Sequence, residues 1–195
     1  IDLEKCTDIQ GLVKSCPAGA INPDDMPRNR EINCASIVLS PGASLFDPSH
    51  LDYLGYDRFP DVVTSLEYER ILSASGPTSG QLTCPSDGRQ PKKVAWIQCV
   101  GSRGLQKGAT SYCSHACCMF ALKEAMVTKE RFQEDIETTI FYMDMRTFGK
   151  DYELYLERAK NDFGVRFLRS RPHSIVQPEG TEGLSITYTM DDSTK

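Results

Sequence analysis

The strongest constraint on this chain is a cluster of cysteines in its second half. Four of the eight cysteines lie between Cys99 and Cys118, in the spacing C-x13-C-x3-C-C. The sequence shows no secretion signal, and adjacent Cys117 and Cys118 make a poor disulfide framework. The cluster therefore favours a metal or redox site in a reducing, cytoplasmic compartment over structural disulfides.

Length and composition narrow the possible partners. The chain has 195 residues, of which 39% are hydrophobic and 25% charged, and these are ordinary values for a globular protein. A formal charge of -5 argues against nucleic acid or an anionic membrane as the main partner. No apolar run reaches the length of a membrane span, so we expect no direct membrane insertion. The start at Ile1, with no charged and apolar leader, indicates either processing or an excised piece of a longer protein, and we favour the excised piece. The chain is too short to be a complete two-nucleotide enzyme.

The cluster sits inside a regular alternation of strand and helix patterns. Buried-strand patterns alternate with amphipathic helices, and short connections join them. This order predicts a Rossmann-like α/β fold of the type found in FAD- and NAD-linked reductases, with a parallel sheet and helices on both faces. The last segment alternates and suggests an antiparallel strand added to the end. The predicted elements are strands at 94–99, 138–145, 165–169 and 184–190, a helix at 115–130 capped by Ser114, and a helix capped by Asp151.

Residues 1–35 form a turn-rich segment with a partial ferredoxin pattern. When Cys6 and Cys16 are aligned with a bacterial ferredoxin ligand run, Ile9 and Leu12 occupy the two middle ligand positions. Two thiolates cannot hold a cubane, so we interpret residues 1–35 as a degenerate ferredoxin-like segment that has lost its cluster. Two unrelated cysteines in a loop remain the open alternative.

Residues 36–91 are expected to form part of a flavoprotein core with a linker. The run at 36–40 predicts a short buried strand ended by a Pro-Gly turn, with Cys34 in the core beside it. The sequence SIVLSPGAS resembles the strand and turn that close the first nucleotide domain of flavoprotein disulfide reductases. An irregular loop at 46–60 and a capped helix at 64–73 follow. A Gly-, Pro- and Ser-rich linker then leads into the third predicted region, 92–195.

The cysteine loop occupies the position at which such a fold binds its ligand. A dinucleotide-binding turn would carry G-x-G-x-x-G after the first strand, but Gly101 and Gly104 are too sparse for that cradle. Cys117 and Cys118 would begin the following helix, where free amides and the helix dipole favour thiolates. An iron-sulfur cluster, a thiol redox or sensing site, zinc, and mere packing of the cysteines in the core all remain open on this pattern. His115 is either an exposed loop residue or a hydrogen-bond donor to a sulfur.

Several runs of residues resemble the A-type subunit of heterodisulfide reductase, the flavin and iron-sulfur subunit of the methanogen enzyme. They are VTSLEYERILSASGPTSG, KKVAWIQCVGSR, YCSHACCMFALKEA and FYMDMRTFGKDYELYLERA, followed by GVRFLRSRP, and they span most of residues 36–190. The resemblance implies a [4Fe-4S] cluster held by four cysteines, which are Cys99, Cys113, Cys117 and Cys118. It also implies FAD in the full-length protein and other subunits of a heterodisulfide-reductase-like complex as partners.

The same resemblance points to three residues that would tune a nearby flavin, namely Glu67, Glu69 and Lys123. The glycine loop that cradles FAD in this family is missing from the chain, so the chain alone is expected to be inactive. Our first hypothesis is an oxidoreductase fragment that transfers electrons between the [4Fe-4S] cluster and FAD. The alternative is a non-enzymatic thiol or zinc-binding scaffold module for the assembly of subunits.

Overall fold

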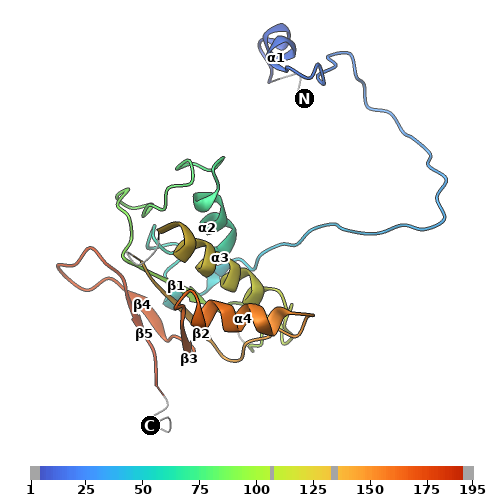
Figure 1. Cartoon of the computed structure of the whole chain (residues 1–195). Helices are drawn as coiled ribbons and strands as arrows, with labels where there is room; N and C mark the ends of the chain where they lie inside the picture. Colours follow the sequence, from blue (N-terminus) through green and yellow to red (C-terminus); the bar gives the residue numbers. More distant parts are fainter. Residues whose placement is uncertain (1–4, 106–107, 133–135, 191–195) are drawn as a thin grey trace. The chain divides into compact units, whose positions relative to one another are not determined.

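The chain divides into two compact units, Ile1–Ala43 and Ser44–Lys195. A computed structural model describes residues 5–105, 108–132 and 136–190 (Figure 1). In the first unit the helix α1, Ile9–Ser15, begins where the Asp8 carboxylate accepts a hydrogen bond from the Gly11 amide at 2.8 Å. No residue of α1 is buried. The ferredoxin-like fold expected for this segment, and the expected boundaries at residues 35 and 91, stay predictions.

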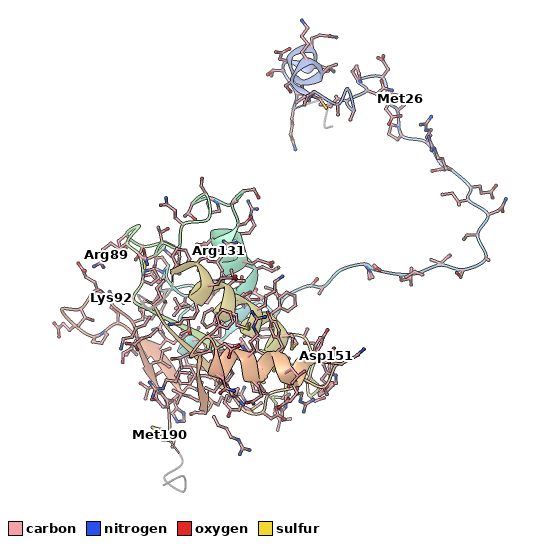
Figure 2. All side chains as sticks on the ribbon, in the orientation of Figure 1. Met26, Arg89, Lys92, Arg131, Asp151 and Met190 are labelled. Carbon is pink, nitrogen blue, oxygen red and sulfur yellow. The ribbon has the colours of Figure 1, made fainter. Side chains whose placement is uncertain are left out.

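The strand expected at residues 36–40 does not form in this structure. The segment pairs with no other strand among the described residues, and Ile37, Val38 and Leu39 are 77%, 87% and 82% exposed. Cys34, expected in a core, is exposed as well. Met26, labelled in Figure 2, is 70% exposed. The prediction was wrong because an apolar run becomes a strand only where a partner strand accepts its backbone hydrogen bonds.

The second unit is built on a three-stranded parallel sheet. Its strands β1 (Lys93–Ile97), β2 (Glu137–Tyr142) and β3 (Arg166–Arg169) lie in the order β1-β2-β3. The helices α3 (Cys117–Phe132) and α4 (Tyr152–Asn161) connect them, so the expected strand-helix-strand-helix-strand order and the α/β class are confirmed. The carboxyl ends of all three strands therefore lie at one edge of the sheet, next to the start of α3.

The α-helices that the structure describes in the second unit pack on one face of the sheet. Trp96, Ile140 and Phe167 lie side by side across the strands and contact this helical core. The helix α2, Ser65–Leu72, joins α3 and α4 in the same core (Figure 1). The buried residues of this core are Tyr68, Ile71, Leu72, Leu82, Trp96, Ala121, Leu122, Ala125, Met126, Ile136, Ile140, Leu156, Ala159 and Val165.

The opposite face of the sheet is covered without α-helices in the part of the chain that the structure describes. Ile97 packs there against Leu51 and Leu54. Leu54 ends the short 3-10 turn Asp52–Leu54, and Leu51 lies between this turn and a second one, Pro48–His50. The loop expected at 46–60 therefore contributes buried residues to a second, smaller core. The expectation of helices on both faces was wrong for the described residues, because these turns and a hairpin bury the apolar side chains of that face.

The hairpin consists of β4, Ser174–Val176, and β5, Ser185–Thr187, which pair antiparallel. It forms a sheet of its own beside the parallel one. The expected antiparallel strand near the C-terminus thus forms, but it pairs within the hairpin and does not extend the main sheet. Phe141 of β2 meets Tyr188 edge-on, with ring centroids 5.0 Å apart, so the hairpin is tied to the sheet by aromatic packing.

The structure does not show the helix caps that were expected at Ser114 and Asp151. His115 has a left-handed backbone with φ of 59°, which interrupts the chain after Ser114, and α3 begins only at Cys117. Asp151 does precede α4, but its φ is 65° and its side chain makes no capping bond. Among the described residues no helix combines the length and apolar character needed to cross a bilayer.

Candidate metal centre

The four clustered cysteines surround the carboxyl end of β1 and the beginning of α3. Cys99 lies two residues beyond the end of β1 and is buried, while Cys117 and Cys118 are the first two residues of α3. Cys113 precedes the helix and is partly exposed. All four thiols are free of disulfides. The expected position of the cysteines at the first crossover turn is therefore seen in the described part of the loop, which leaves out residues 106–107.

Left-handed backbone conformations fold this loop tightly. Cys99 has φ of 60° and Arg103 has φ of 55°. Few residues other than glycine adopt this left-handed backbone conformation readily. Gly101, with φ of 69°, lies against the Phe46 ring, and an added Cβ would stand 2.1 Å from the ring's Cγ atom. The Gly101 carbonyl accepts a hydrogen bond from the Thr110 amide at 2.9 Å, and this bond joins the two ends of the loop. Glycine alone meets both demands at this position.

The four thiols lie close enough to influence one another's ionisation. Burial raises the pKa of Cys99, and the neighbouring Cys117 and Cys113 raise it further. The interaction between the neighbouring Cys117 and Cys118 thiols raises the pKa of Cys117 and lowers that of Cys118. Cys99 and Cys113 in turn raise the pKa of Cys118. A positive ion or cluster would relieve this mutual repulsion of thiolates.

One thiol, that of Cys113, accepts an N–H hydrogen bond, and N–H groups near the other three act to lower their pKa values. The His115 amide donates to the Cys113 sulfur at 3.3 Å. The backbone N–H groups of Arg146 and Cys99 lower the pKa of Cys118 and of Cys117, respectively. The positive charge of the Arg103 guanidinium acts to lower the pKa of Cys99. Donors of this kind stabilise thiolates, and hydrogen bonds to sulfur set the potentials of iron-sulfur clusters.

A chain of charged side chains borders the thiols. Arg103 pairs with Asp144, just beyond the end of β2, and Arg146 reaches the same carboxylate at 3.5 Å. Burial would raise the pKa of Asp144, but the hydrogen bond and charge of Arg103 hold it below its ordinary value. Arg146 also meets the His115 ring, with 3.0 Å between its Nη1 atom and Nε2. His115 thus joins the site through its backbone amide at Cys113 and its ring at Arg146.

The donor set consists of four thiols, which are ligands that both zinc and iron-sulfur clusters accept. Zinc needs four ligands around one point, with sulfur about 2.3 Å from the metal. Within residues 5–105, 108–132 and 136–190, no three Cys, His, Asp or Glu residues are grouped so that they could hold a metal ion. The thiols lie around the turn without converging on one point. A cubane attaches each thiolate to a different iron, so its ligands stand farther apart, and all-cysteine ligation is its usual chemistry.

The three expected flavin-tuning residues lie on α2 and α3. The Glu67 carboxylate already has hydrogen-bond partners close by. It accepts hydrogen bonds from the Tyr56 hydroxyl at 3.0 Å and from the Thr64 amide at 2.6 Å. It also lines an apolar groove of about 460 Å³ over α2. Glu69 and Lys123 are exposed, and both are near enough to the Glu124 carboxyl to affect its pKa. Their role toward a flavin stays a prediction.

Sequence reasoning missed two groups of residues at or near the site. Asp144 and Arg146 follow β2, and their place at the carboxyl end of a predicted strand could have marked them. Glu124 is buried on α3, where its Oε2 atom accepts the Trp96 indole N–H at 2.7 Å and its Oε1 atom has no partner. An acidic residue between the core residues Leu122 and Ala125 was the available signal.

Comparison with known proteins agrees with these observations. No family profile matches the chain. It is 38% identical over 193 residues to the A-type subunit of H(2):CoB-CoM heterodisulfide,ferredoxin reductase from Methanothermobacter marburgensis, covering 99% of this chain and 28% of that protein. The chain is similar to one part of the heterodisulfide reductase A-type subunit.

Further A-type subunits of heterodisulfide reductase match at similar levels. The iron-sulfur A-type subunit of CoB--CoM heterodisulfide reductase from Methanocaldococcus jannaschii is 41% identical over 186 residues, or 95% of this chain and 28% of that protein. One from Methanopyrus kandleri is 43% identical over 169 residues, or 87% of this chain and 26% of that protein. The chain thus spans about a quarter of the length of its curated relatives, and these are subunits of an oxidoreductase.

Proposed function

We propose that this chain is the cluster-bearing part of a heterodisulfide-reductase-A-like oxidoreductase, in which Cys99, Cys113, Cys117 and Cys118 hold a [4Fe-4S] cluster. The observation that carries the proposal is the gathering of four free thiols around one turn, where they lie near enough to shift one another's pKa. When bound, such a cluster would supply a site that takes up and releases single electrons, exchanged with FAD in the full-length protein.

The residues of the chain would bind and position this group from both ends of the turn. Cys99 approaches from the end of β1, and Cys117 and Cys118 approach from the first turn of α3. The free amides and positive dipole end of that helix stabilise the thiolate form that ligates iron. The words "iron-sulfur subunit" in the names of two relatives agree with an iron-sulfur site. The other subunits of a heterodisulfide-reductase-like complex are the partners that we propose.

Anaerobic reconstitution of the chain with iron and sulfide tests this function. We expect about four irons and four sulfides per chain, with broad absorption near the blue end of the visible spectrum. Cys117→Ala should lose most of both, because one of four ligands is gone. The matched control is Cys34→Ala, because Cys34 is an exposed cysteine of the first unit and its loss should leave iron content unchanged. Colourless protein that binds one zinc tightly would contradict the proposal and support the scaffold alternative.

A further inference from the structure

Cys113 is the candidate ligand that receives the least support from secondary structure. Cys99 is buried just beyond β1, and Cys117 and Cys118 belong to the first turn of α3. Cys113 lies in the irregular segment that leads into α3, and it is partly exposed. A sulfur in such a segment moves away from its neighbours easily unless further contacts hold it. The contacts made by His115 are of this kind.

The backbone of His115 holds the Cys113 sulfur. The His115 amide donates a hydrogen bond to that sulfur at 3.3 Å. The left-handed backbone of His115, with φ of 59°, then turns the chain into α3. Histidine is found in this conformation more often than most residues other than glycine. One residue therefore places the amide at the sulfur and directs the chain toward the next two candidate ligands.

The imidazole of His115 is held on two sides although the residue is exposed. The Arg146 Nη1 atom lies 3.0 Å from its Nε2 atom, and because a guanidinium can only donate, Nε2 is the acceptor. The Phe148 ring meets the imidazole edge-on, with centroids 4.9 Å apart and 82° between the ring planes. An exposed side chain without such neighbours changes rotamer freely. These contacts therefore anchor His115 at its place before α3.

Arg146 is itself anchored just beyond the end of β2, next to a second candidate ligand. Its Nε atom lies 3.5 Å from the Asp144 carboxylate. The carbonyl oxygen of Asp144 lies 4.0 Å from the Cys118 sulfur. This short stretch thus contacts Cys118 directly and reaches Cys113 through His115. The relative positions of the two sulfurs therefore depend on the same few residues.

We propose that His115 and Arg146 are positioning residues, which together hold the Cys113 sulfur in place as a ligand of the group bound by the four thiols. This inference rests on the proposed function above. The His115 amide orients the sulfur, and Arg146 fixes His115 against the end of β2. Groups that orient metal ligands through hydrogen bonds affect how firmly the metal is held. Without them, Cys113 should leave the bound group more often than the other three thiols do.

The test measures how often each cysteine leaves the metal in the anaerobically reconstituted chain. Iron and sulfide analysis comes first, because a wild-type chain that takes up no iron would defeat the proposed function and this inference with it. Loaded protein is then treated with iodoacetamide, which alkylates thiols that are free of metal, and each cysteine is quantified by mass spectrometry. Exposed Cys34 is the internal reference, since its rate should be the same in every variant.

Arg146→Met removes the guanidinium and keeps the length of the side chain. In this variant Cys113 should be alkylated roughly three- to tenfold faster than in wild type, while the other three ligands stay protected. His115→Asn keeps the amide and suits the left-handed backbone, but it loses the imidazole, so it should show the same gain at Cys113. Arg146→Lys should lie between wild type and Arg146→Met, because an ammonium group can still donate to Nε2. The double variant should equal His115→Asn, because the Arg146 contact is already lost there.

The matched control is Arg158→Met, in the last part of α4. Arg158 also lies beside an acid, with 3.9 Å between its Nε atom and the Asp162 carboxylate, and over an aromatic ring, that of Phe163. Its replacement removes contacts of the same kinds from another part of the sheet's helical layer. Cys113 should therefore be alkylated in this variant at the wild-type rate.

The outcomes separate this inference from the proposed function. If loaded Arg146→Met or loaded His115→Asn alkylates Cys113 at the wild-type rate, the inference is overturned while the proposed function stands. Faster alkylation of all four ligands would also overturn it, because a general loosening of the fold would then be the cause. If Arg146→Met takes up no iron, His115→Asn decides: a wild-type rate at Cys113 overturns the inference, and a faster rate there alone supports it.

Discussion

At the scale of single residues, the most unusual side chain outside the cysteine loop is Glu124. It is 5% exposed, lies on α3 beyond Cys118, and has the Trp96 indole as the partner for one of its two carboxyl oxygens. Burial raises its pKa to about 7, against the lowering effect of that hydrogen bond. Exposed Glu69 raises it further and Lys123 lowers it. A carboxyl with this pKa changes its charge near neutrality.

The raised pKa of Glu124 predicts how stability depends on pH. Between about pH 4.5 and pH 7 the folded chain keeps this proton while the unfolded chain releases it. The free energy of unfolding should therefore fall as pH rises through this window, by up to about 3 kcal/mol. Glu124→Gln should remove most of that fall in denaturant titrations followed by circular dichroism.

The control for this prediction is Glu130→Gln, which changes an exposed acid on the same helix. It should retain the wild-type dependence on pH. A wild-type profile that is flat between pH 5 and pH 7 would show that Glu124 is not protonated preferentially in the folded chain. We expect the free energy of unfolding to fall with pH in wild type and to stay nearly constant with pH in Glu124→Gln.

At the scale of elements, the start of α2 rests on a reciprocal cap. The Thr64 hydroxyl accepts the Glu67 amide at 3.4 Å, and the Glu67 carboxylate accepts the Thr64 amide and hydroxyl at 2.6 and 2.8 Å. Removing the hydroxyl in Thr64→Ala should cost about 1 kcal/mol of unfolding free energy. Ser65→Ala, one residue later, should cost little because Ser65 is not the capping residue. Equal losses in the two variants, measured by denaturant titration, would contradict the capping role.

The elements that the sequence predicts well are those whose signals are local. The capping box at Thr64 and the apolar spacing of Leu122, Ala125 and Met126 need no knowledge of the rest of the chain. The helix α2 forms where it is expected, and α3 forms with its start two residues later than expected. The cysteine spacing likewise places the candidate site at the end of β1. The side chains of Asp144 and Arg146 could not be assigned to the site in this way, because their contacts depend on how β2 lies beside β1.

Non-local partners also explain the elements that were predicted wrongly. The run at 36–40 has the composition of a buried strand, but composition does not supply a neighbouring strand. His115 adopts a left-handed backbone as part of the tight loop, so the helix starts two residues later than its sequence suggests. Helices on both faces were expected by analogy with larger nucleotide-binding sheets. Among the residues that the structure describes, short turns and a hairpin bury the second face instead.

At the scale of the whole molecule, the exposed apolar run Ile37 to Leu39 predicts self-association. Unpaired apolar residues with free backbone groups are ready to pair with another chain. Val38→Lys should therefore weaken concentration-dependent association, measured by sedimentation velocity. The control is Leu154→Lys, which places the same charge at an exposed position of α4 and should not change association. A wild-type chain that stays monomeric at all concentrations would contradict this prediction.

The contact between Trp96 and Glu124 gives the chain a built-in optical probe. Trp96 is its only tryptophan, so intrinsic emission excited at the indole band comes from one known place. That indole donates its N–H to Glu124 and meets the Tyr68 ring edge-on, with centroids 5.4 Å apart. The indole therefore lies where β1, α2 and α3 meet. A change in emission can be assigned to this junction of three elements without adding a label.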